Sequence, residues 1–288
     1  MIKTNQEKIV RFALQSHPDH PSSSSNGYWV GYDGKGRILP GVGGITYNFF
    51  VGDSCLGIAG DHIEPGVSSK AGVEGQNNAY NQLVCVGNQV TVISGKAEGK
   101  KGFVSGTHGG VEHVMLAFDA DTLSKLTYHD EFLVEAYGQG LCLLDHPDIK
   151  VMSLDPELLQ KMNIKENENG LDVGVTAIVP AFLMGSGLGS SQIISGDYDI
   201  MLHDEEAVKK YGLEHLRFGD LVYIEDHYCG NGPDYKKGAG SIGVIVHSDS
   251  YTSGHGPGVC IMMTALDGKI TPFIDDKANL KYLMDFKK

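Results

Sequence analysis

Acids and histidines of the types that bind metals gather on short glycine-rich segments of this chain. The first segment, residues 60–68, reads GDHIEPGVS and brings Asp61, His62 and Glu64 close together in sequence. In an extended segment His62 and Glu64 lie on one face and can point at one place. Imidazole and carboxylate groups so placed bind divalent ions or transfer protons. The alternative is an ordinary turn whose polar groups face water.

A second segment, residues 107–113, reads THGGVEH. Two glycines follow His108, so that backbone or ligand can approach its ring closely. His113 opens an apolar run and is also explained as a half-buried strand residue. His108 is therefore the candidate ligand of this segment.

The third segment, GDYDI at residues 196–200, carries two acids at strand spacing. Asp197 and Asp199 then share a face, where paired carboxylates bind a hard cation or share a proton. A solvated strand edge explains the same pattern.

Two later segments complete the set. Asp226 and His227 end an apolar run and could project into a cleft, or simply face solvent. His255 stands in the sequence Gly-His-Gly-Pro-Gly, whose backbone N–H groups at Gly256 and Gly258 could support an oxyanion. Cys229 is disfavoured as a nucleophile, because no group is evidently placed to orient His227 as its base.

Together these segments predict a metal-assisted hydrolase of a small polar molecule such as an amide. A divalent ion would lower the pKa of bound water and polarise a carbonyl. Zn²⁺, Mn²⁺ or Fe²⁺ suits mixed ligands, and Mg²⁺ or Ca²⁺ suits a site of carboxylates alone. The assigned roles are metal ligands at Asp61, His62, His108 and Asp226, catalysis by Glu64 as general base and by His255, and substrate binding at Asp197, Asp199, Gly256 and Gly258.

Two other functions fit the same residues. The loops could shape the pocket of a non-catalytic ligand-binding protein, assembled as a homo-oligomer that covers exposed strand edges. A weaker alternative is RNA association through the three lysines Lys96, Lys100 and Lys101.

Composition limits the partners. The 288 residues carry 23 Lys and Arg against 36 Asp and Glu, a net charge of −13 that disfavours nucleic acid and anionic lipid. Five cysteines without a CxxC pair predict reduced thiols in the cytoplasm. Neither the N-terminus nor the uncharged run at 173–196 has an apolar stretch long enough for export or for a membrane span.

The elements that must position these residues are mostly strands. Short β-rich runs punctuated by 39 glycines predict a mainly β fold of barrel or sandwich modules, one of them SH3-like. Only a few short helices are expected. They are a helix after the capping box at residues 4–7 that includes Phe12 and Ala13, and further helices at 155–161, 204–212 and 276–285.

Two patterns suggest modules. Residues 126–135 and 216–225 align as a turn that enters a strand, which is either a structural repeat or the common form of such segments. The polar loop at 163–170 is the best boundary, giving a domain at 1–162 and another at 163–288.

Several motifs resemble known families. Residues 87–106, within a hairpin at 87–118, resemble the KOW motif of ribosomal proteins and transcription factors. From residue 40 to 259 the chain resembles a microbial family of domains of unknown function, through GDHIEPGVS, HGG, LMGSGLG, GDYDI, LRFGDLV and SGHGPGV. It is also distantly similar to the acetamidase/formamidase group, which implies a β-rich hydrolase of simple amides but carries over no catalytic residue.

Overall fold

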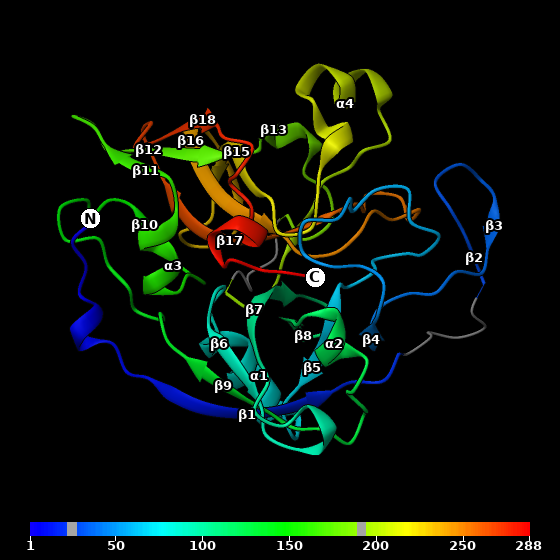
Figure 1. Cartoon of the computed structure of the whole chain (residues 1–288). Helices are drawn as coiled ribbons and strands as arrows, with labels where there is room; N and C mark the ends of the chain where they lie inside the picture. Colours follow the sequence, from blue (N-terminus) through cyan, green and yellow to red (C-terminus); the bar gives the residue numbers. More distant parts are fainter. Residues whose placement is uncertain (22–27, 189–193) are drawn as a thin grey trace.

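The fold is mainly β with short helices, as the sequence predicts. A computed structural model describes residues 1–21, 28–188 and 194–288. Gly189, the last residue of LMGSGLG, lies outside these ranges. In Figure 1 strands β1 and β4 to β9 lie in the lower half and the C-terminal sheets in the upper half.

The N-terminal half forms a closed six-stranded barrel. It closes because β1 pairs with both β9 and β5, and β4 (Ile45–Thr46) extends it beyond β5. The strand order is β1 (Phe12–Pro18), β9 (Phe132–Ala136), β6 (Gln89–Val92), β7 (Lys101–His108), β8 (His113–Ala117) and β5 (Gly66–Lys70). The hairpin predicted at 87–118 thus supplies β6, β7 and β8 of this barrel.

The C-terminal half holds two further sheets. The larger runs β10 (Lys150–Val151), β17 (Gly258–Ala265), β16 (Asp234–Ile245), β15 (Leu221–Tyr228) and β13 (Ala177–Pro180), with β14 (Tyr198–Asp199) paired to β17. The smaller runs β11 (Ile164–Glu166), β12 (Leu171–Val175) and β18 (Ile270–Ile274). A separate hairpin joins β2 (Trp29–Val30) to β3 (Gly36–Arg37).

The barrel and the larger sheet share one hydrophobic core. Barrel residues such as Phe103 and Met115 belong to the same buried cluster as Ile242 and Met262 of the sheet. Strands β8 and β17 are buried along their whole length, which is expected only where both faces are covered. A Cβ at Gly106 would lie 2.2 Å from Val246 Cγ1, so the two halves approach closely there. Because the junction between barrel and larger sheet is mostly apolar and closely packed, polar side chains buried there need a specific explanation.

The helices agree in part with the prediction. α3 (Pro156–Lys161) and α4 (Glu205–Tyr211) are confirmed, with Asp155 and Asp204 accepting hydrogen bonds from backbone N–H groups of their first turns. Gly212 ends α4 in the left-handed conformation, and α5 (Leu280–Leu283) fills the middle of the last predicted range.

The predicted N-terminal helix is wrong. Only one 3₁₀ turn forms (Gln6–Lys8), and Phe12 and Ala13 pair with β9 in strand β1, because barrel closure supplies backbone hydrogen bonds along the strand, whereas a short isolated helix is marginal. Helices that the sequence patterns did not predict are α1 (Glu74–Leu83) and α2 (Ala120–Leu123), besides 3₁₀ turns at Gly95–Ala97, Ala181–Leu183 and Leu213–His215.

The two aligned segments share a local turn. The carboxylate of Asp130 accepts from the backbone N–H of Thr127, and that of Asp220 accepts from Arg217, directly before β9 and β15. Across the described ranges, no helix combines the length and the apolar character that crossing a membrane requires.

Candidate metal centre

Two groups of histidine and aspartate side chains meet where the barrel joins the larger sheet. The first consists of His62, Asp199 and His255, which come from three separate loops or strand ends. His255 Nδ1 lies 2.9 Å from Asp199 Oδ2 and 3.0 Å from His62 Nε2. His62 Nε2 lies 3.5 Å from the same Asp199 oxygen. Three potential ligand atoms thus converge on one place.

The second group consists of His108, Asp197 and His247. The rings of His108 and His247 stack with centroids 4.2 Å apart. His247 Nε2 lies 2.8 Å from Asp197 Oδ2, yet neither atom has a hydrogen-bond partner of acceptable geometry among the described residues. The short distance without alignment is the pattern of two ligand atoms that face a common third point, not of a hydrogen-bonded pair.

Acceptors behind the rings fix which nitrogen faces the centre. His62 Nδ1 lies 2.7 Å from Asp61 Oδ2, and His108 Nδ1 lies 2.7 Å from Glu64 Oε1. His247 Nδ1 lies 2.9 Å from the carbonyl oxygen of Ser248, which can only accept. Each Nδ1 therefore carries a proton, and each Nε2 of a neutral ring is left as a ligand.

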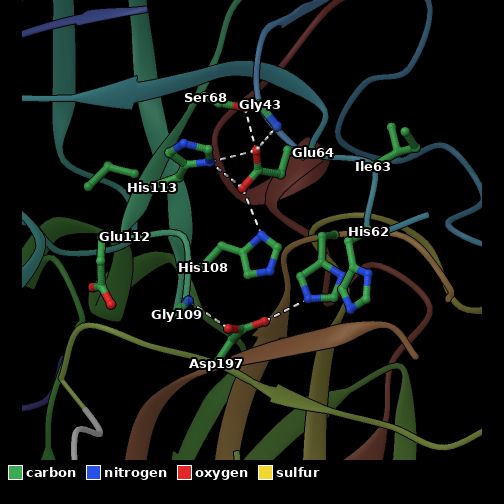
Figure 2. Close-up of polar contacts among 12 residues, drawn as sticks. Gly43, His62, Ile63, Glu64, Ser68, His108, Gly109, Glu112, His113 and Asp197 are labelled. Atoms are coloured by element: carbon green, nitrogen blue, oxygen red, sulfur yellow. Dashed lines mark hydrogen bonds and ion pairs between the residues drawn. The ribbon is translucent and has the colours of Figure 1, made fainter. Parts of the chain in front are cut away.

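Glu64 is a buried orienting group. Its carboxylate accepts from His108, from His113, from the Ser68 hydroxyl and from the Gly43 N–H, as Figure 2 shows. Burial alone would raise the pKa of Glu64, but the two histidines outweigh burial and hold it well below its usual value. Because its side chain is fully buried behind His108, Glu64 does not reach the cavity in front of the rings, where a general base would act.

Asp61 has the same role behind His62. Its other oxygen accepts from the Ser250 hydroxyl and the Tyr251 N–H, so both oxygens are occupied away from the centre. His62 itself has φ +52°, a conformation that costs energy in a residue other than glycine and that turns its ring toward His255.

The aspartates set the charge of the centre. Burial would raise the pKa of Asp199, but His247, His255 and His62 outweigh it and hold the pKa well below its usual value. Burial would likewise lower the pKa of His247, while Asp197 and Asp199 raise it well above its usual value. Without a cation other than the proton, this site therefore draws protons to neutralise its carboxylates.

A cavity of about 230 Å³ opens in front of the two groups. His62, His108, His255 and both aspartates line it, together with Glu112. The rest of its described lining is small: Gly109, Gly110, Ser186, Gly187, Ser195 and Gly196. No Lys or Arg occurs among the described lining residues, so the protein offers no cationic side chain to an anionic substrate.

A larger cavity of about 620 Å³ lies elsewhere, over the outer surface of the barrel. Arg11, Lys101 and Lys161 line it beside Glu135 and Asp155, a mixture of charges without a converging group. The smaller cavity is the better functional candidate, because buried histidines and carboxylates converge only on that one within the described chain.

Three predicted site residues lie differently from expectation. Asp226 belongs to neither group; it sits at an irregularity of β15 with φ +55°, and its carboxylate accepts from Gly238 N–H. The Gly256 N–H donates to Asp199 and so is not free to hold an oxyanion. Gly258 lies within β17, where a Cβ would come within 2.2 Å of both Asp197 Oδ2 and His247 Nε2. Its role here is to leave room for these two side chains.

The residue-type argument missed two members of the site. His247 follows the apolar run GVIV and looks like the end of a buried strand, so only His255 of that segment was selected. Glu112 has φ +55°, and its carbonyl accepts from the buried Asn77 and Asn81 side chains, which hold this conformation. Glu112 lies in the turn between the paired strands β7 and β8, and residue type alone does not reveal that position.

Fold and site together define a mainly β protein with a histidine–carboxylate centre between a barrel and a second sheet. The chain belongs to the family described as domain of unknown function (DUF4438): its N-terminal model matches residues 28–160 and its C-terminal model residues 161–284. A solved structure titled "Crystal structure of TM1086" is 44% identical, with a TM-score of 0.92 over 99% of this chain and 98% of that one. No curated protein matches the chain. The likenesses to KOW segments and to acetamidase/formamidase are not shown by these comparisons.

Proposed function

We propose that the protein is a metal-dependent hydrolase of a small neutral polar molecule, with simple amides as the first class to test. One observation carries the proposal: the rings of His62, His108 and His247 each have Nδ1 fixed by an acceptor, and two of them, His62 and His108, line one small cavity together with two aspartates. Carboxylate or carbonyl acceptors behind metal-binding histidines are the usual arrangement in protein metal sites.

The donor set favours particular ions. Four imidazoles with two carboxylates suit Zn²⁺, Mn²⁺ or Fe²⁺, whereas Mg²⁺ and Ca²⁺ prefer oxygen ligands throughout. An ion held by His62, His255 and Asp199 would supply an activated water and polarise a carbonyl. In this proposal Asp197 and Asp199 act as ligands, and Asp61 and Glu64 orient ligands.

Proton transfer is assigned to Glu112. Three acidic side chains line the described cavity. Asp197 and Asp199 contact the histidines, so Glu112 is the one that is available to transfer a proton. The volume and the absence of lining Lys and Arg favour a small, uncharged substrate over a phosphate or a carboxylate.

The test measures turnover and metal together. Purified protein would be stripped with a chelator, reloaded with Zn²⁺, Mn²⁺ or Fe²⁺, and assayed for ammonia release from a panel of small amides. We expect turnover that chelation abolishes and metal restores, and that His255→Ala lowers at least 100-fold. His146→Ala is the matched control, since His146 pairs with Glu166 outside the centre.

The same assay separates the alternatives. Metal-dependent stabilisation by an amide without any ammonia release would favour the non-catalytic ligand-binding protein. Full thermal stability and no bound metal in wild type would contradict the metal-dependent hydrolase. The homo-oligomer and the cytoplasmic location remain parts of the proposal; the five free cysteines fit a reducing compartment.

A further inference from the structure

We infer that the two groups hold two divalent ions side by side, with Asp199 as the bridging carboxylate, an inference that rests on the proposed function. The two groups are thus one dinuclear centre and not alternative sites for a single ion.

Asp199 faces both groups at once. Its Oδ2 lies 2.9 Å from His255 Nδ1 and 3.5 Å from His62 Nε2, in the first group. Its Oδ1 lies 3.5 Å from His247 Nε2, in the second. The Gly256 N–H donates to Oδ2 from behind and holds the carboxylate in place. One carboxylate with an oxygen in each group is the geometry of a bridge between paired ions.

The spacing of the ligand atoms matches a coordination shell. Ligands about 2.1 Å from an ion are separated by about 3.0 Å in octahedral and about 3.4 Å in tetrahedral geometry. The separations within the first group are 2.9, 3.0 and 3.5 Å, and that between His247 and Asp197 is 2.8 Å. Of these four contacts, only the one between His62 and His255 has the alignment of a hydrogen bond.

The contact between His247 and Asp197 needs a positive charge, either a proton on the ring or a metal ion. Because His247 Nδ1 donates to the Ser248 carbonyl, the neutral ring presents a lone pair at Nε2 to an anionic oxygen 2.8 Å away. Two acceptors at that distance repel unless a positive charge lies between or beside them. His247 is fully buried and Asp197 nearly so, and the other Asp197 oxygen is already held by the Gly109 N–H. A proton on Nε2 would not be aligned with the Asp197 oxygen, so these unpartnered atoms point to a metal ion in the second group, in addition to that in the first.

Charge balance agrees with two ions. If the four histidines are neutral, two divalent ions carry four positive charges, and four carboxylates in or behind the centre balance them. The four are Asp61, Glu64, Asp197 and Asp199. With a single divalent ion, the other two charges would have to be met by protons on histidines, such as His113, which contacts both Glu64 and Asp19.

The two positions differ in exposure. In the first group, the His255 side chain is 32% exposed, whereas in the second His247 is completely buried. We therefore expect the outer ion to exchange readily and the inner ion to be retained. The outer ion is the one that a substrate in the cavity can reach.

The experiment counts ions and detects their coupling in the intact chain. Wild type loaded with Mn²⁺ and freed of excess metal would be measured by elemental analysis and by electron paramagnetic resonance. We expect two ions per chain and the many-line spectrum of a coupled pair. His247→Ala would keep one ion with an isolated six-line spectrum, and Asp199→Asn would lose the coupling. His227→Gln, at a buried histidine outside the centre, should keep both ions and the coupled spectrum.

One outcome overturns the inference alone. A single ion per wild-type chain, an isolated Mn²⁺ spectrum and intact amide turnover would leave the hydrolase standing with a mononuclear site. No ion and no turnover would overturn the hydrolase and the dinuclear centre together. The wild-type spectrum decides the matter even if His247→Ala fails to fold.

Discussion

Histidines in two regions of this protein have opposite surroundings. In the centre described above, carboxylates stand beside or behind every ring. In β15, His227 is completely buried, and its Nδ1 lies 2.9 Å from the Ser241 hydroxyl and 3.5 Å from Cys229 Sγ, with no carboxylate in contact among the described residues. Burial lowers the pKa of His227 to about 4 and raises that of Cys229 to about 12.

The difference is in the partners, not in burial. A ring among neutral groups stays neutral and fills space, and a thiol there stays protonated and unreactive. Rings among carboxylates gain from a cation. Burial of a histidine is therefore weak evidence for function, while burial together with two or more carboxylates is strong evidence. Each prediction below tests one side of this comparison.

The largest effect should come from removing the ions. Chelation of metal-loaded wild type should lower the melting temperature by roughly 5–10 °C, because an ion present at 100 times its Kd stabilises by about 2.7 kcal/mol. Differential scanning calorimetry with and without chelator measures the shift. His227→Gln should show the same chelator-induced shift. A wild-type melting temperature that chelation leaves unchanged would contradict metal binding by the rings that lie among carboxylates.

Loss of an orienting carboxylate comes next. Glu64→Gln should weaken metal affinity by about 10- to 100-fold, the usual cost of losing a group that orients a metal-binding histidine. The amide cannot accept from His108 and His113 as a carboxylate does. Competition with a chromophoric chelator measures the affinity. Affinity equal to wild type would mean that Glu64 only packs behind the rings.

His227→Gln tests the histidine among neutral groups through the pH dependence of the free energy of unfolding. A histidine whose pKa falls from 6.5 to about 4 on folding binds more protons when unfolded. It therefore contributes fully above pH 6.5, and stability is lost as pH falls toward 4, by about 3 kcal/mol at most. Urea unfolding of the metal-free proteins should show a shallower loss between pH 6.5 and 4 in the variant. Parallel curves for the two proteins would contradict a neutral buried His227.

The smallest effects are expected outside both the histidine–carboxylate centre and the surroundings of His227. Asp226→Asn should leave metal content unchanged and alter the free energy of unfolding by less than about 0.5 kcal/mol, since Asn also tolerates a positive φ and can accept from Gly238. Loss of an ion in this variant would indicate that Asp226 is a metal ligand after all.

Lys100→Glu should not change RNA retention at low salt. Lys100 pairs with Asp121 and Lys101 contacts Gln89 on the barrel surface, in a chain of net charge −13. A filter-binding comparison with wild type checks this, and wild-type binding that the variant loses would support the RNA alternative.

The fold was predictable where local chemistry decides it. Glycine-punctuated strands and the caps at Asp155 and Asp204 follow from side-chain and backbone preferences. The N-terminal helix failed because Phe12 pairs with Ala136, more than a hundred residues away in sequence. Local propensity carries no information about such a partner.

The residue types of the candidate site were predictable from the sequence, but which residues belong to it was not. His62, His108, Asp199 and His255 stand out in glycine-rich segments, and the fold brings them together. Asp226 has the same appearance yet lies apart, and His247 looks like a core residue yet lies inside. Which segments meet is decided by how the barrel packs on the larger sheet, and spacing along the chain does not report that.

Anomalous diffraction at the zinc edge, from crystals of wild type grown with Zn²⁺, tests the central claim most directly. We expect two peaks. One lies within ligand distance of His62, His255 and Asp199, and the other lies within ligand distance of His108, His247 and Asp197. Absence of any peak among these side chains, with the rings hydrogen-bonded to one another and to water, would contradict it.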